Sequence, residues 1–404
     1  MGLCSAGYRK NMQKLGSSIK GGFKIMTVQE SFDEKKALME DFADHKKLSR
    51  VPIVSMAQTW AIDYAGKKAA DILDGSPEQE FEIYSKHLRD IYFDCVLLFG
   101  MNRPIRAYEA LGYSPFFISN DGVSIQAGDY SLLPLEELDE YIADPIRYIR
   151  DIMLPRRYPN LRKPFPENMQ ALGECVQKLM GFVGKNGMEE EYLRNNVGVP
   201  VLAIDLVEPA LDRYINYRGW KDGMLDLRRR PEKVLEALEA TYPVVAPSPM
   251  PKKSFPWQFY PVVSVTYLNR KNFEKFFWPT FKRSVEAILA TGGKVCVCME
   301  GKWGHVYDMF LEFPKGSIIA FLEDDDLIET KKKIGDKVAL AGGLKAQLMK
   351  DGTREENIEA VRRLLGECGN EGVMLSLNKC LLSPGDVNPD NMAAVSDFVR
   401  SYTF

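Results

Sequence analysis

The sequence predicts an α/β fold, and more specifically a (β/α)8 barrel of the TIM type. Short apolar runs typical of strands alternate with longer amphipathic runs typical of helices, which is the pattern of βαβ units on a parallel sheet. Eight strand candidates can be counted, and eight strands with intervening helices fit a closed barrel better than an open sheet. The chain has 404 residues, of which 45% are hydrophobic. This length allows two or three domains or one elaborated barrel, and we favour one barrel because the sequence contains no low-complexity linker or short repeat.

The first half of the chain carries fewer strands than the second. A helical N-terminal extension is expected over residues 1–48, because residues 30–47 form a charged amphipathic pattern. The barrel is expected over residues 49–404, with a helix-rich insertion at about 130–197 that is interrupted by prolines. The other elements expected here are strands at 51–56 and 95–99, a hairpin at 116–126, and helices at 77–91 and 169–184.

The second half is more regular, since each short strand is followed by a helix. Pro231 opens the first of these helices, at a position where its missing N–H is not needed. The expected strands are 199–207, 262–267, 294–299, 317–322, 338–341 and 373–377. The expected helices are 230–242, 272–290, 327–333, 354–366 and 389–402.

The composition narrows the functional classes. The chain carries 53 basic and 56 acidic residues, a net charge of -3, so its bulk electrostatics indicate neither nucleic acid nor a membrane as a partner. No apolar run approaches the roughly 18 residues of a membrane span. The N-terminal 25 residues also lack the continuous apolar centre of a secretory signal. Seven cysteines are an odd number, which indicates free or metal-bound thiols in a reducing compartment, and we therefore expect a cytoplasmic protein.

The run at residues 294–301 separates into two faces when it is taken as a strand. One face is apolar, and the other carries Lys294, Cys296, Cys298 and Glu300. Carboxylates are rarely buried without a partner, so a face with two thiols and a carboxylate indicates half of a metal site. The ordinary alternative is that the cysteines are packing residues, because cysteine is among the residues most often buried.

In a TIM barrel, the chemistry lies at the carboxyl ends of the strands. Glu300 and Cys380 both follow predicted strands, and together with Cys298 they form the expected functional group. Asp205 is a possible acid–base residue, since it lies in another predicted strand, and Glu300 could serve that role with or without a metal. Glu323 and His305 are further possibilities, although an acidic run and a single histidine more often lie on solvated loops.

Several aromatic residues lie near predicted strand ends. Each could simply belong to the core, but together they could line a pocket for a flat apolar substrate such as a methoxylated aromatic. The expected substrate pocket consists of Trp60, Tyr260, Tyr267, Trp303 and Asn378.

Several segments resemble the uroporphyrinogen decarboxylase superfamily. The similar segments are residues 217–219, 226–235, 334–343, 351–356 and 388–395. The resemblance extends from about residue 200 to residue 404, and it is looser from 48 to 130. Members fold as (β/α)8 barrels and carry out either porphyrinogen decarboxylation or zinc-dependent methyl transfer to or from corrinoids.

Two departures distinguish between these chemistries. The decarboxylases carry an arginine-rich loop that binds the carboxylates of the substrate, whereas residues 54–60 here contain no arginine. The methyltransferases carry a His-x-Cys-Gly motif and a later cysteine as zinc ligands. Cys298, Glu300 and Gly301 fall where that motif would be, and Cys380 falls where the final cysteine would be. Zinc accepts thiolate and carboxylate ligands, so Cys298, Glu300 and Cys380 are its expected ligands here.

The resemblance therefore implies a zinc-dependent methyltransferase. It would move a methyl group between a small donor, possibly an aromatic methyl ether as in an O-demethylase, and a corrinoid. The chain has no Asp-x-His-x-x-Gly cobalamin motif, so the corrinoid is expected on a separate partner protein. A homodimer is possible. The alternatives are a lyase or decarboxylase that acts on a smaller substrate through Glu300 or Asp205, and a barrel without catalytic activity.

Overall fold

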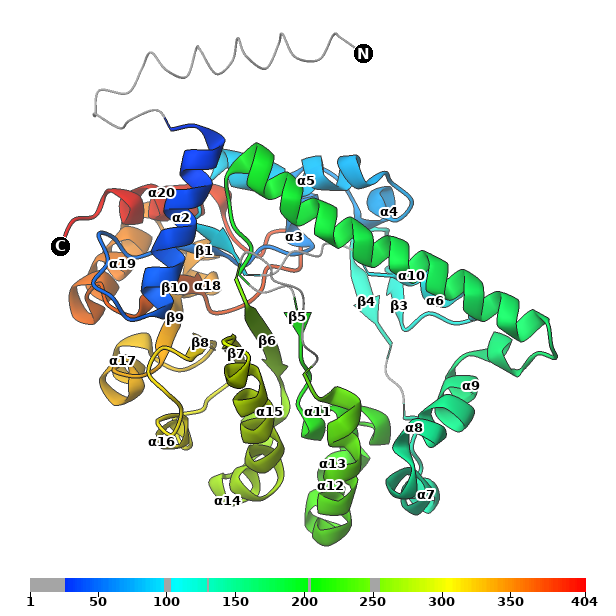
Figure 1. Cartoon of the computed structure of the whole chain (residues 1–404). Helices are drawn as coiled ribbons and strands as arrows, with labels where there is room; N and C mark the ends of the chain where they lie inside the picture. Colours follow the sequence, from blue (N-terminus) through cyan, green and yellow to red (C-terminus); the bar gives the residue numbers. More distant parts are fainter. Residues whose placement is uncertain (1–25, 98–102, 129–130, 203–204, 248–254) are drawn as a thin grey trace.

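The computed structural model describes residues 26–97, 103–128, 131–202, 205–247 and 255–404. Within this part of the chain, eight short strands line the centre of the molecule and helices surround them (Figure 1). The eight central strands are β1 (Val54–Ser55), β2 (Cys95–Val96), β5 (Asp205–Leu206), β6 (Trp257–Val262), β7 (Lys294–Met299), β8 (Ile318–Leu322), β9 (Ala339–Leu344) and β10 (Val373–Leu377).

The strands are joined into a closed ring. β5 to β10 form a six-stranded parallel sheet in chain order, and β1 pairs with β2, also in parallel. Single parallel bridges join the two sheets at Ile53 with Leu375 and at Val96 with Val201. Hydrogen bonds support both joints, because Leu375 N donates to Pro52 O (2.8 Å) and Leu202 N donates to Val96 O (2.9 Å). The predicted (β/α)8 barrel is therefore confirmed.

The helices of the first half agree with the sequence in type. α2 (Val28–Ala43) begins at a capping box, in which Thr27 and Glu30 each bind the backbone of the other. The predicted hairpin is present as the antiparallel pair of β3 (Phe116–Ile118) and β4 (Ile125–Ala127). The other α-helices described before β5 are α3 (Trp60–Tyr64), α4 (Ala69–Ile72), α5 (Pro77–Asp90), α6 (Ile105–Glu109), α7 (Leu138–Ala143), α8 (Pro145–Tyr148), α9 (Leu154–Arg157) and α10 (Glu167–Tyr192).

The helices of the second half cover the outside of the six-stranded sheet (Figure 1). They are α11 (Ala210–Arg218), α12 (Trp220–Arg229), α13 (Pro231–Val245), α14 (Arg270–Asn272), α15 (Trp278–Ala290), α16 (Tyr307–Phe310), α17 (Leu327–Ile334), α18 (Ala346–Asp351), α19 (Arg354–Cys368) and α20 (Pro389–Ser401). None of the helices in the described ranges is long and apolar enough to cross a membrane.

One predicted strand was misplaced. The sequence pattern predicted a strand at residues 262–267, but β6 lies earlier, and a 3-10 turn, η5 (Ser264–Tyr267), follows it. β6 pairs with β7 from Trp257 opposite Lys294 to Val262 opposite Met299, where β7 ends. A strand over 262–267 would extend past the end of this partner, so the alternating pattern there describes a turn with two buried residues.

Other boundaries also differ from the predictions. The helix expected at 272–290 is divided into α14, a π-helical turn η6 (Phe273–Phe277) and α15, and Pro279 lies at the start of α15. Proline lacks an N–H and crowds the preceding turn, which accounts for the break. Residues 98–99 of the strand expected at 95–99, residues 203–204 of the strand expected at 199–207, and Cys4 with the rest of the first 25 residues lie outside the described residues.

The long helix α10 buries a carboxyl group without a complete set of partners. Glu189 is 1% exposed, and its Oε1 has no hydrogen-bond partner among the described residues. Burial raises the pKa of Glu189 to about 8, and the nearby carboxylate of Glu80 adds to this rise. Lys185 lies close enough to oppose the shift, but it is itself paired with Glu80 at 2.5 Å.

Replacing Glu189 with glutamine is expected to change how stability depends on pH. An unfolded glutamate ionises near pH 4.5, whereas the folded one holds its proton to about pH 8. The folded protein therefore binds more protons between these values, and its stability falls as the pH rises through them. Glu189→Gln removes this penalty, so thermal unfolding should show a higher Tm than wild type at pH 8 and little difference at pH 4.5. An equal change in Tm at both values would contradict the assignment.

Candidate functional site

The loop after β7 holds the motif residues through their backbone. Thr266 Oγ1 donates to Glu300 O at 2.7 Å, and Trp303 Nε1 donates to the same oxygen at 3.0 Å. Gly301 N donates to Glu323 Oε2 at 2.6 Å. Glu323 follows β8, so a carboxylate from the next strand fixes the turn that carries Glu300. Glu323, which the sequence offered only as a possibility, therefore faces this loop.

The two predicted thiols lie within electrostatic range of each other and of two carboxylates. Burial raises the pKa of Cys298 well above its usual value, and Cys380, Glu300 and Glu323 add to the rise. Burial also raises the pKa of Cys380 to about 11, with further contributions from Glu300 and Glu323. The pKa of Glu300 is raised by burial and by Glu323. The site thus gathers groups whose negative forms repel one another.

Two further groups lie beside Cys380. Gln58 and the Arg103 guanidinium both lie close enough to Cys380 to lower its pKa, against the effect of burial. These residues follow β1 and β2, so the ends of five strands, β1, β2, β7, β8 and β10, contribute to one face of the barrel. No sequence pattern selects either residue, because a single glutamine or arginine in a loop carries no spacing signal.

The fit of a metal to this group can be tested on the described geometry. No three histidine, cysteine, aspartate or glutamate side chains within the described ranges are spaced to hold a metal ion. Cys298, Glu300 and Cys380 are donors of the kind that zinc accepts, yet they do not form a ligand set as they stand. We therefore derive no chemical step through a metal.

Three of the predicted pocket residues are instead core residues. Trp60 is 3% exposed, and Tyr260 and Trp303 are fully buried. Tyr260 points outward to helix α15, where its hydroxyl bonds Ser284 Oγ at 2.6 Å, and Trp303 packs among phenylalanines such as Phe277. These side chains present no surface to a substrate, because large aromatics near a strand end can pack into the helix layer as readily as into a pocket.

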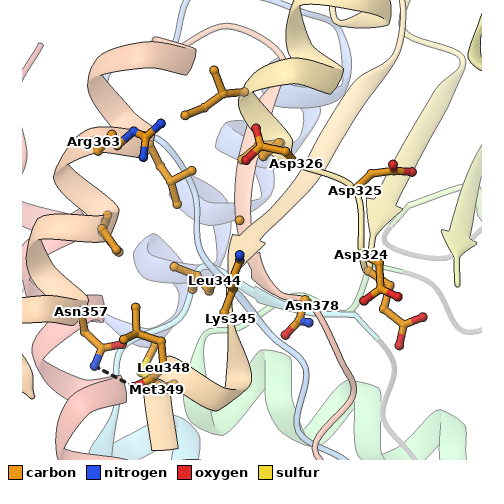
Figure 2. Close-up of a pocket in the computed structure, with 17 residues that line it drawn as sticks. Asp324, Asp325, Asp326, Leu344, Lys345, Leu348, Met349, Asn357, Arg363 and Asn378 are labelled. Atoms are coloured by element: carbon orange, nitrogen blue, oxygen red, sulfur yellow. Dashed lines mark hydrogen bonds between the residues drawn. The ribbon is translucent and has the colours of Figure 1, made fainter. Parts of the chain in front are cut away.

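The other two predicted pocket residues lie in different places. Tyr267 is exposed and packs edge-on against Trp220, with ring centroids 5.3 Å apart. Asn378 lines a cavity of about 440 Å³ beside α17, α18 and α19, and its Oδ1 accepts a hydrogen bond from Ala346 N at 2.9 Å. Figure 2 shows Asp324, Asp325 and Asp326 along one side of this cavity, with Lys345 and Asn378 nearer its centre.

Asp205 lines a larger cleft, of about 1120 Å³, between α10 and α11. It does not share a cavity with Asn378 in the described structure. The polar residues along the cleft are Asn186, Glu190, Asp205, Glu208, Asp212, Arg213, Asn216 and Gln258.

Asp212 is the residue that sequence reasoning missed. It lies in the first turn of α11, is 5% exposed, and accepts a hydrogen bond from Ser264 N on Oδ1 at 2.9 Å. Burial raises the pKa of Asp212 to about 7, and Glu208 and Glu300 add to the rise. A useful signal was available in the sequence, since an aspartate in the helix turn just after a barrel strand is placed on the active face.

The remaining candidates are structural. His305 bonds Leu268 O through Nε2 at 3.0 Å. Cys95, Cys175 and Cys368 are free and buried.

Comparisons with known proteins bear on the fold and on the second half of the chain. Residues 259–402 match the family model described as uroporphyrinogen decarboxylase (URO-D). No curated protein matches the chain. Among solved structures, a methyltransferase from Methanosarcina mazei is similar over 93% of this chain and 99% of that one, with a TM-score of 0.55 and 12% sequence identity. The family model begins within β6 and extends through α20, so the part of the chain that is similar to this family includes Cys298, Glu300 and Cys380.

Proposed function

We propose that the protein is a methyltransferase that moves a methyl group between a small-molecule donor and a corrinoid carried by a separate protein. The observation that carries the proposal is the group formed by Cys298, Cys380, Glu300 and Glu323 at the ends of three barrel strands. The fold, shared with a methyltransferase, supports it. Residues 54–60 also lack the arginines with which a decarboxylase of this superfamily would bind a porphyrinogen.

Zinc binding by Cys298, Glu300 and Cys380 is part of this proposal. The donor types suit zinc, and a bound cation would relieve the repulsion among the negative forms of these groups. Because the three side chains are not spaced as ligands, binding requires them to move together and to release the thiol protons.

The donor class is less constrained. The predicted aromatic lining of a substrate pocket suggested an aromatic methyl ether as the donor. Three of those side chains, Trp60, Tyr260 and Trp303, lie in the core. The aromatic surface that remains is the pair of Tyr267 and Trp220. The proposal that the methyl donor is an aromatic methyl ether is therefore supported by that pair alone.

The second candidate function is a lyase or decarboxylase that acts on a smaller substrate. The raised pKa of Glu300 suits an acid–base residue, and Arg103 beside Cys380 supplies a cation for a substrate carboxylate. Asp205 lies in the separate cleft and is the other acid–base candidate for this function.

Metal content and methyl transfer can be measured on three variants. Cys298→Ser and Cys380→Ser should each lose zinc and lower the rate of corrinoid methylation by more than about 100-fold, since even indirect partners of a metal change activity by 10- to 100-fold. Cys296→Ala is the matched control, because Cys296 lies on the same strand but is fully buried in the core. It should keep both properties.

The outcomes separate the candidate functions. Less than about half an equivalent of zinc in the wild type, unchanged in both serine variants, would contradict the metal. Release of carbon dioxide from a small carboxylic acid, without methylation of a corrinoid, would favour the lyase.

A further inference from the structure

The cleft between α10 and α11 contains buried acceptors that no described residue satisfies. Asp212 Oδ2 and Gln258 Oε1 both belong to residues that line the cleft, and neither atom has a hydrogen-bond partner. The other oxygen of Asp212 is held by Ser264 N, which fixes the carboxyl group in place. Buried polar atoms are normally paired, so two unpaired acceptors in one cleft indicate a ligand that donates hydrogen bonds.

The charges along the cleft favour a cation. Four carboxylates line it, from Glu190, Asp205, Glu208 and Asp212, against one guanidinium, that of Arg213. Arg213 forms an ion pair with Glu208, so its charge is already compensated. Glu190 is likewise paired, with Arg194 at 3.8 Å. An anionic ligand would be repelled by the Asp212 carboxylate, whereas an ammonium group would pair with it.

The walls of the cleft suit an apolar body with an aromatic or aliphatic character. Trp220, Val245 and Pro261 contribute apolar surface. Trp220 is also part of the aromatic pair with Tyr267, and indole faces attract cations. The volume of about 1120 Å³ is ample for a small organic molecule.

We propose that this cleft binds an organic ammonium ion with an apolar body, and that Asp212 Oδ2 and Gln258 Oε1 accept hydrogen bonds from its N–H groups. The cleft adjoins the proposed methyl-transfer centre through the turn η5, in which Ser264 N binds Asp212 and Thr266 Oγ1 binds Glu300 O. This inference goes beyond the proposed function, since binding requires neither a corrinoid nor a metal.

The test is calorimetric titration of the full chain at pH 8 with benzylamine, benzyl alcohol and benzoate. Benzylamine should bind, benzyl alcohol should bind at least about 10-fold more weakly because it carries no positive charge to pair with Asp212, and benzoate should not bind. Asp212→Asn keeps the side-chain shape and the acceptor for Ser264 N, and should weaken benzylamine about 10-fold or more. Gln258→Leu should weaken it by a smaller factor.

Glu189→Gln is the matched control for these variants. Glu189 is also a buried carboxyl with an unpaired oxygen, but it does not line the cleft, so this variant should bind benzylamine as the wild type does. Benzoate binding as tight as that of benzylamine, or unchanged benzylamine affinity in Asp212→Asn, would overturn the proposal. The comparison of benzylamine, benzyl alcohol and benzoate on the wild type tests the proposal even if a variant fails to fold. Because no methyl acceptor is present, a failure here is distinct from a failure of methyl transfer.

Discussion

Replacing Gly301 with alanine is expected to disable the site and to destabilise the fold by about 2 to 4 kcal/mol. Gly301 has φ of +73°, which L side chains rarely adopt, and an added Cβ would lie 1.7 Å from Thr266 Oγ1. The clash would separate the two loops that Thr266 joins through Glu300 O. Methyl transfer should fall by more than about 100-fold, since displacement by about 1 Å costs that much in a positioned site.

Gly292→Ala is the matched control for the clash. Its φ is +79°, but a Cβ at that position meets nothing within 4 Å, so it should cost only the backbone strain of about 1 to 2 kcal/mol. Adding Thr266→Ala to Gly301→Ala should recover part of the lost stability, as measured by urea unfolding. If Gly301→Ala were no less stable than Gly292→Ala, the close approach of these loops would be wrong.

Replacing Asp226 with alanine should destabilise the protein by about 3 to 5 kcal/mol, because it would leave a buried cation unpaired. Asp226 is 2% exposed, and Oδ2 accepts bonds from Arg218 Nε at 2.8 Å and from Tyr214 OH at 3.0 Å. Oδ1 accepts a bond from Arg230 Nη1 at 2.8 Å. Arg218 Nη1 also donates to Leu133 O, so this network joins α11, α12 and α13 to the insertion.

Asp222→Ala provides the comparison in the same helix. Asp222 lies one turn earlier in α12 and is exposed, so its loss should change the free energy of unfolding by no more than about 1 kcal/mol. Urea unfolding of both variants measures the difference. Similar values for the two would show that the Asp226 network contributes little, and a strong dependence on salt would show that it is screened by solvent.

The strands and their carboxyl ends could be predicted because apolar strand runs and helical periodicity are local patterns in the sequence. Cys296, Cys298 and Glu300 share one face of the predicted strand, and the position of the strand end leaves Cys298 and Glu300 nearest the mouth of the barrel. The structure has Cys296 fully buried and Cys298 half-buried. That order follows from strand periodicity and the position of the strand end, which the amino-acid pattern contains.

The orientation of aromatic side chains could not be predicted in the same way. Tyr260 and Trp303 satisfy their polar atoms at Ser284 and at Glu300 O, and these partners depend on tertiary packing. The place of Asp212 after a barrel strand could have been used to select it, but its burial and its partner at Ser264 depend on a turn that the pattern had presented as a strand. The spacing of Cys298, Glu300 and Cys380 is likewise a property of three loops and not of any one segment.

The uneven ring of strands has a consequence for how such chains can vary in length. Between β2 and the segment at Val201, the ring is held by a single bridge, and the hairpin and the helices up to α10 are inserted there. The entropy of closing a loop grows only with the logarithm of its length. The insertion can therefore lengthen or shorten at small cost, while the long ladders from β6 to β10 keep the reactive end of the barrel in register. Changes in chain length are therefore best tolerated at the singly bridged joint between Val96 and Val201.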